Sequence, residues 1–469
     1  MPQTLQKYKK TFVGSRAFYA MVLAVVVPII VQNAISNFVN LLDNIMVGKV
    51  GTDQMAGVSI ANQLLFVANL CIFGGMSGAG IFAAQYHGAS DVDGVRYCFR
   101  YKIWLSIALT AISIILFSIW GGKLIALYLN EENADQRIAD TLGFGLSYLR
   151  IMLLGIGPFA LSQAYASTLR ETGNTALPMR AGIIAVFVNL VFNYLLIYDH
   201  FGHAGLGVNG AAIATVLSRY VELGIMLIAT HRQPKRYRFI EGAYRSLKLP
   251  ASLAKRITVK GMPLLLNEAL WSLGVAMLSQ CYSLRGLDVV AAMNISSTVS
   301  NLFNVVFISM GNATAIIIGQ TLGSGEADQA LDYAWKLIAF SLASCVVTGA
   351  LLAIAAPFIP RIYNTEPAIR QLATRFLWVG AGCMPLFSFC NSCYFIIRSG
   401  GKTMITFLFD CVFSWVVSIP LALLLIYKTA LPVVTVFLMV QLADIIKCVL
   451  GYIMVKRGIW IHNMAEERA

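Results

Sequence analysis

The sequence predicts an all-α polytopic membrane protein with twelve transmembrane helices, arranged as two six-helix lobes related by a parallel internal repeat. Of its 469 residues, 58% are apolar and only 12% are charged, whereas a soluble domain carries about 45–50% apolar and about 25% charged residues. A charge content this low cannot cover a globular surface in water. Long apolar runs recur along the whole chain, and the second half repeats the first. These observations exclude a soluble enzyme with a single membrane anchor.

Twelve apolar runs are long enough for a spanning helix, which needs about 20 residues. In the first half the expected helices are residues 17–47, 55–86, 100–129, 142–169, 176–198 and 208–230. In the second half they are residues 257–282, 289–321, 333–363, 369–397, 403–427 and 431–455. Residues 232–256 form the only substantial linker, which separates a predicted N-terminal lobe (1–231) from a C-terminal lobe (257–469).

The formal net charge of +13 comes mainly from basic loops on one side of the predicted bundle. The linker alone contains Arg232, Lys235, Arg236, Arg238, Arg245, Lys248, Lys255 and Arg256. By the positive-inside rule we expect this linker and both termini in the cytoplasm, and the protein in the cell (inner or plasma) membrane. The charge therefore indicates orientation and not a nucleic-acid partner, and contact of the linker with anionic lipid is a further option.

The two sides of the linker repeat each other. Pro28 and Pro263 are 235 residues apart. The same offset pairs Gly51 with Gly286, Asp53 with Asp288, Ala56 with Ala291, Asn69 with Asn304, Gln85 with Gln320, Gly88 with Gly323 and Asp93 with Asp328. Further on, the offset becomes 228 for Arg170 and Arg398 and 222 for Glu222 and Asp444. Because each half has an even number of spans, both enter the membrane in the same sense, and repeated bundles of this kind place a central site between the halves.

Polar side chains crowd two helices of each half. The first helix carries Gln32, Asn33, Ser36, Asn37, Asn40, Asp43 and Asn44, and spacings of three and four place them on one face. Amides can also hold membrane helices together, at about 0.6 kcal/mol for an average hydrogen bond. The density of amides favours a hydrated cavity over that alternative. The candidate substrate-cavity residues are Gln32, Ser36, Asn40, Asn62, Trp271, Asn294 and Asn301.

Ionisable residues inside spans are few and costly, which makes them candidates for function. Asp43 and Glu268 have no basic neighbour one turn away, and Asp410 is a third candidate. Glu222 and Asp444 do have such neighbours, Arg219 and Lys447, which favours structural ion pairs there. A lone carboxylate in a wet cavity can bind a proton, a sodium ion or an organic cation, but not two at once. Mutually exclusive occupancy is the minimum requirement for an exchanger.

Other chemistry is not expected. The tripeptide Gly401-Lys402-Thr403 would end a phosphate-binding loop only if position 396 were glycine, and it is Ile396. His200 and His203 have no third ligand in sight, and no hydrolytic constellation is present. The sequence therefore predicts no enzyme, no metal site and no cofactor beyond a coupling ion.

The chain resembles the MATE (multidrug and toxic compound extrusion) family over nearly its whole length. The resemblance rests on Pro28 followed by Asp43 in the sequence LLDNIMVG, on Gln85-x-x-Gly88 and its repeat Gln320-x-x-Gly323, and on Arg170-x-x-Gly-Asn-Thr. It implies an exporter of amphipathic, cationic organic compounds driven by inward H⁺ or Na⁺, with a cavity between the lobes that opens alternately to either side. It also assigns helix bending to Pro28 and cation coupling to Asp43.

The sequence departs from both main branches of that family. Where the DinF-like branch has an acid four residues after an asparagine, this chain has Asn193 after Asn189, and Trp271 stands where the NorM-like branch has a glutamate. The expected coupling residues are therefore Asp43, Asn189 and Asn193, with Glu268 as a second carboxylate, and H⁺ and Na⁺ both stay open. A flippase for a lipid-linked saccharide is the alternative function, and a membrane-embedded enzyme or receptor is the third. We expect a monomer.

Overall fold

The computed structural model describes residues 12–48, 50–127, 135–198, 205–363 and 365–466, with side chains for all of these except residues 40, 41, 44, 45, 48, 52 and 135–137. Within the described ranges, twelve helices are long and apolar enough to cross a membrane. No strand occurs in these ranges. The predicted all-helical class and the twelve spans are confirmed.

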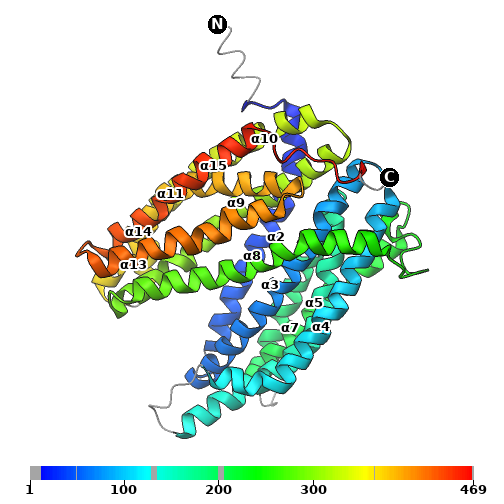
Figure 1. Cartoon of the computed structure of the whole chain (residues 1–469). Coiled ribbons are helices and arrows are strands. Elements are labelled where there is room, and N and C mark those ends of the chain that lie inside the picture. The colour runs from blue at the N-terminus through cyan, green and yellow to red at the C-terminus, as the bar shows by residue number, and fades with distance from the viewer. Residues whose placement is uncertain (1–11, 49, 128–134, 199–204, 364, 467–469) are drawn as a thin grey trace, which may run out of the picture. The chain divides into compact units, whose positions relative to one another are not determined.

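The first six spans are single helices separated by short connections (Figure 1). They are α2 (Arg16–Gly48), α3 (Thr52–Gly88), α4 (Val92–Ala126), α5 (Asp135–Glu171), α6 (Ala176–Ile197) and α7 (Val208–Arg232). A short 3₁₀ turn, η1 (Arg238–Ile240), follows in the linker.

The second six spans begin with four long helices. They are α8 (Ala251–Ser283), α9 (Leu287–Gly323), α10 (Ala327–Ala355) and α11 (Pro367–Ser399), with the 3₁₀ turn η2 (Ile359–Ile362) before α11. The eleventh span consists of α12 (Thr403–Phe407), η3 (Leu408–Val412), η4 (Ser414–Ser418) and α13 (Ile419–Lys428). The twelfth consists of α14 (Val433–Leu442) and α15 (Asp444–Lys456).

Several helices start earlier than the hydropathy pattern predicts. Helix α4 begins at Val92 instead of residue 100, α5 at Asp135 instead of 142, and α8 at Ala251 instead of 257. The stretch without a long helix therefore ends at residue 250, six residues before the predicted linker boundary of 256. Hydropathy detects only the part of a helix that lies in lipid, whereas polar turns continue the same helix into water.

The eleventh and twelfth spans contain irregular turns that the sequence pattern did not predict. Residues 408–412 and 414–418 are π-helical, and the twelfth span is interrupted at Ala443. Two of these three irregularities lie at an acidic residue, Asp410 in η3 and Asp444 at the start of α15. π-Helical turns are rare and frequently lie at functional sites.

The chain groups into two compact units. Unit 1 contains Met1–Ile30, Ala84–Asp91 and Val259–Ala469, and unit 2 contains Val31–Ala83 and Val92–Thr258. In comparison with the predicted lobes 1–231 and 257–469, residues 1–30 and 84–91 are grouped with the second half. Helices α2 and α3 therefore contribute to both units.

Each unit has its own apolar core. In unit 2, α4 packs on α5, α5 on α7 and α6 on α7, around a core that includes Ile72, Leu149 and Ile156. In unit 1, α9, α10, α11 and α15 pack together, and Val22 at the start of α2 is buried among them.

The repeated Gln-x-x-Gly motif marks a reciprocal close contact within unit 1. A Cβ atom at Gly88 would come within 1.9 Å of the Gln320 carbonyl oxygen, and a Cβ atom at Gly323 would come equally close to the Gln85 carbonyl oxygen. The side chain of Gln85 donates to the carbonyl oxygens of Ser399 (2.8 Å) and His462 (3.1 Å). Glycine is needed twice because two helix ends, α3 and α9, touch backbone to backbone.

Candidate functional site

Asp43 on α2 is held by two amides of α6. Asn193 Nδ2 donates to Asp43 Oδ1 at 2.5 Å. The amide nitrogen of Asn189, turned toward the carboxylate, lies 3.0 and 3.2 Å from its two oxygens, and Asn189 Oδ1 then accepts from Thr215 Oγ1. Both asparagines are buried, and their spacing of four residues places them on one face of α6. The structure thus brings together three of the four predicted coupling residues within unit 2.

The Asp43 carboxylate forms no ion pair within the described part of the chain. Asn193 Oδ1 beside it is buried and lacks a hydrogen-bond partner within the described part of the chain. An ionised carboxylate and an amide oxygen are both acceptors, so this pair suits a proton donor or a hard cation, which prefers oxygen ligands.

Three predicted cavity residues of the first half lie outside this amide–carboxylate group. Gln32 precedes Asp43 by eleven positions, about 16 Å along α2, and accepts from Arg170 Nη1 at 3.4 Å. Asn62 Oδ1 on α3 accepts from the Tyr148 hydroxyl at 3.2 Å. Ser36 is half-buried, and Asn40 lies outside the residues whose side chains are described.

A second carboxylate group lies in unit 1, around Lys447 of α15. Lys447 Nζ lies 3.0 Å from Asp444 Oδ1 and 3.8 Å from Asp410 Oδ1. The predicted pair of Asp444 with Lys447 is confirmed, and Asp410 joins it from the neighbouring span. Lys447 is buried, with 8% of its surface exposed, and its ammonium also lies 5.3 Å from the centre of the Phe413 ring.

The remaining predicted residues of the second half lie on α8 and α9. Glu268 is half-buried, and the charged side chains that interact with it are Arg398 and Asp410. Trp271, Asn294 and Asn301 are exposed. An exposed amide at membrane depth needs water or a polar partner, as the predicted cavity would provide.

The structure connects three residues whose association sequence reasoning did not predict: Asn267, Asp410 and Lys447. Asn267 Nδ2 donates to Asp410 Oδ2 at 3.2 Å, and Asn267 itself is 2% exposed. The repeat contained a signal for two of the three. At the offset of 228, Asp410 stands where the first half has Gly182, and at the offset of 222, Lys447 stands where it has Ile225. The second half therefore has an acid and a base at positions where the first half has neither.

The ion pair predicted between Arg219 and Glu222 does not occur among the described residues. Arg219 Nη1 donates to the Gly155 carbonyl oxygen at 3.2 Å, and its guanidinium lies 4.8 Å from the Phe159 ring centre. Glu222 interacts electrostatically with both Arg170 and Arg219. The first half thus shares one acid between two arginines, whereas the second shares one lysine between two acids.

Comparison with protein families gives a match in each half of the chain. The model of the MatE family matches residues 28–195 and again residues 263–424. The two matches begin at Pro28 and Pro263, the pair that defines the offset of the repeat. Together they cover well over half of the chain.

Relatives of similar length and fold support the same grouping. The chain is 23% identical over 404 residues to the probable multidrug resistance protein NorM of Thermotoga maritima, which covers 85% of this chain and 84% of that protein. It is 23% identical over 416 residues to the probable multidrug resistance protein YoeA of Bacillus subtilis, with 88% of each covered.

Among solved structures, one described as the outward-facing conformation of a multidrug resistance MATE family transporter of the MOP superfamily has a TM-score of 0.83. It is 19% identical and covers 94% of this chain and 96% of that chain. At this level of identity the likeness shows the fold, which agrees with the predicted one.

Proposed function

The chain belongs to the MATE family (MatE), whose model matches both of its halves, and from this membership we propose that it is a secondary active antiporter. It exports amphipathic, cationic organic compounds in exchange for H⁺ or Na⁺, by alternating access. The relatives from Thermotoga maritima and Bacillus subtilis are both described as probable multidrug resistance proteins. The bilayer is the surrounding partner of this multi-pass membrane protein, and we place both termini in the cytoplasm because the linker is basic.

One observation supports the coupling role above all others: Asp43 is a membrane carboxylate held by amides and by no described cation. The amides of Asn189 and Asn193 fix its position while leaving its charge uncompensated. A proton or Na⁺ can neutralise it, and so can a cationic substrate. Because these occupants exclude one another, entry of the ion releases the substrate, and this exclusion is the basis of exchange.

Pro28 provides a place for α2 to bend. Proline lacks the N–H that would continue the helix ladder, and it is a common cause of helix kinks. The division between the two compact units falls between Ile30 and Val31, two residues after this proline. We assign to Pro28 the hinge that lets the Asp43 end of α2 respond to its ion.

The substrate site is assigned to the polar residues that the apolar spans present on α2, α3, α8 and α9. These are Gln32, Ser36, Asn40, Asn62, Trp271, Asn294 and Asn301. An aromatic ring such as Trp271, which is 43% exposed, suits an organic cation through its π face. Glu268 is the second carboxylate of the proposal, next to Arg398.

Reconstitution tests the proposal directly. Purified protein in proteoliposomes receives a panel of fluorescent organic cations, with ΔpH and ΔpNa imposed separately. We expect transport under one of the two gradients, and that gradient identifies the ion. Asp43→Asn should reduce gradient-driven transport to the level of empty liposomes while gel filtration shows a folded protein.

The matched control is Asp410→Asn, which also removes one membrane carboxylate but from the group that contains Lys447. It should retain most of the transport. Full transport by Asp43→Asn, or loss of transport in both variants to the same degree, would contradict the assignment of coupling to Asp43.

A further inference from the structure

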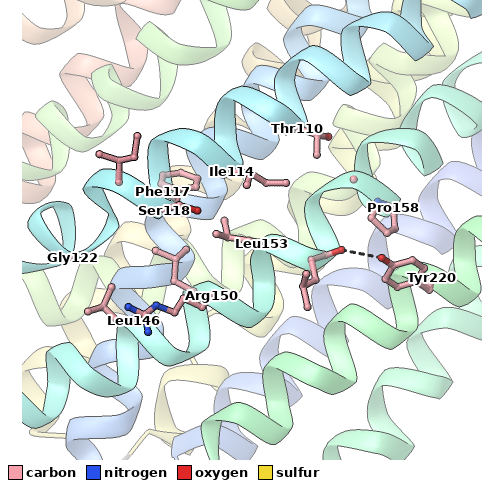
Figure 2. A pocket seen from close by; sticks show the side chains of 14 residues that line it. Thr110, Ile114, Phe117, Ser118, Gly122, Leu146, Arg150, Leu153, Pro158 and Tyr220 are labelled. Atoms are coloured by element: carbon pink, nitrogen blue, oxygen red, sulfur yellow. Dashed lines mark hydrogen bonds between the residues drawn. The ribbon is translucent and has the colours of Figure 1, made fainter.

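A groove between α4 and α5 lies in unit 2, apart from the residues around Asp43 (Figure 2). It has a volume of about 780 Å³, and Tyr220 of α7 lies at one end, where its hydroxyl donates to the Leu154 carbonyl oxygen at 3.3 Å. Most of its lining is apolar, and Ile119 and Leu154 are 62% and 65% exposed. Exposed apolar walls within spanning helices are suited to a hydrocarbon chain.

Arg150 is the one charged side chain among the residues that line this groove. It is exposed, lies within the spanning helix α5, and forms no ion pair or hydrogen bond with any described residue. Other arginines of these helices are held: Arg170 by Gln32 and Arg219 by the Gly155 carbonyl. A cation inside a span is costly and normally has a partner, and the described part of the chain provides none for Arg150.

The direction of Arg150 indicates where that partner lies. Figure 2 shows its guanidinium beside Leu146, one turn earlier in α5, which agrees with the usual tilt of helical side chains toward the N-terminus. At the same end the groove is lined by Gly122, about 6 Å before the end of α4 at Ala126. Exposed Lys123 follows directly. Long cationic side chains extend in this way toward the membrane surface, so the cationic end of the groove faces the headgroup level.

We propose that this groove is a binding site for an anionic phospholipid of the bilayer. Its phosphate pairs with Arg150 near the α4–α5 connection, and one acyl chain runs along the groove toward Thr110. From Gly122 to Thr110 the groove follows α4 for about 18 Å, a length suited to an acyl chain. A zwitterionic lipid would bring its own cation next to Arg150 and Lys123, and a cationic transport substrate would be repelled by them. The charge therefore selects an anionic lipid.

The test measures lipid binding and does not depend on transport. Delipidated protein in detergent is titrated with phosphatidylglycerol or with phosphatidylcholine of the same chains, and bound lipid is counted by native mass spectrometry. We expect the protein to retain one phosphatidylglycerol in preference to phosphatidylcholine. Arg150→Gln should weaken this binding roughly tenfold, since a charge-assisted pair with phosphate is lost. Arg150→Lys should keep most of it.

Two further variants distinguish lipid binding in the groove from a general effect of positive charge on lipid binding. Ser118→Phe fills the groove from an exposed position and should weaken phosphatidylglycerol binding without removing charge. Arg375→Gln removes an exposed arginine from α11, the helix that repeats α5, and that arginine does not line the groove. The Arg375→Gln variant should bind phosphatidylglycerol as tightly as the unmodified protein does. Equal binding by the unmodified protein and Arg150→Gln, equal binding of both lipids, or an equal loss in Arg375→Gln would overturn the proposal.

Discussion

The two halves of the chain hold their membrane carboxylates in different ways. In the first half, Asp43 is bound by the amides of Asn189 and Asn193 and has no described cation beside it. In the second half, Asp410 and Asp444 share the ammonium of Lys447. A carboxylate bound only by amides can still exchange ions, whereas a carboxylate beside a fixed lysine already has its counter-ion.

Repeat-related positions show where the two halves differ. Gly182 and Asp410 are equivalent at the offset of 228, and both contact the repeat-related amide of their own half. A Cβ atom at Gly182 would lie 3.2 Å from Gln32 Nε2, and Asp410 Oδ2 accepts from Asn267 Nδ2 at 3.2 Å. The second half therefore contains an additional acid at a repeat-related contact, together with the lysine that pairs with it. The comparison suggests that one half couples to an external cation and that the other contains an internal one.

The largest expected effect tests Lys447, the cation that the second half contains. Lys447→Met leaves two half-buried carboxylates without the buried ammonium that they share. Breaking a fully buried pair on one side costs about 3–5 kcal/mol, which is the upper limit for this variant. We expect a clearly lower thermal unfolding midpoint of the protein in detergent. Adding Asp410→Asn to Lys447→Met should recover part of the loss, because one unpaired charge is removed. An unchanged midpoint in Lys447→Met would remove the distinction between the halves.

A smaller effect tests a feature in which the two halves agree. Gly88→Ala and Gly323→Ala each push a methyl group against a backbone carbonyl, and overpacking of this kind costs about 1–3 kcal/mol. The two variants should lower the unfolding midpoint by similar amounts, since the contact is reciprocal. Gly143→Ala in α5, where a Cβ atom meets nothing within 4 Å, should leave it unchanged or raise it. Tolerance of alanine at either motif glycine would contradict the close contact.

The smallest expected effect concerns a partly exposed ion pair between neighbours on one helix. Lys336 pairs with Asp332 one turn away on α10, and the Asp332 side chain is 40% exposed. Exposed pairs contribute about 0–1 kcal/mol, so Lys336→Met should hardly move the unfolding midpoint. This variant is the matched control for Lys447→Met, because it removes the same charge from a lysine that also pairs with an aspartate. A shift as large as that of Lys447→Met would mean that burial does not distinguish the two pairs.

Much of the first-half site could be predicted because its signals are local. Asn189 and Asn193 are four residues apart, so they share a helix face wherever α6 lies. The repeat and the MATE motifs then directed attention to Asp43. In contrast, Asp410 was a third candidate that the sequence could not assign to a site. Its partners Asn267 and Lys447 lie on other spans, and no local pattern connects them to it. The π-helical turns around Asp410 also lack a sequence signal of their own.

The sequence by itself determined the twelve spans, the parallel repeat and the family, because hydropathy and motif spacing are properties of short segments that persist in any packing. It also determined which few carboxylates the membrane must accommodate. Only the tertiary structure decided which of them are neutralised. That depends on distances between side chains more than a hundred residues apart in the sequence, such as Asn193 to Asp43 and Asn267 to Asp410, and such distances are set by how whole helices pack.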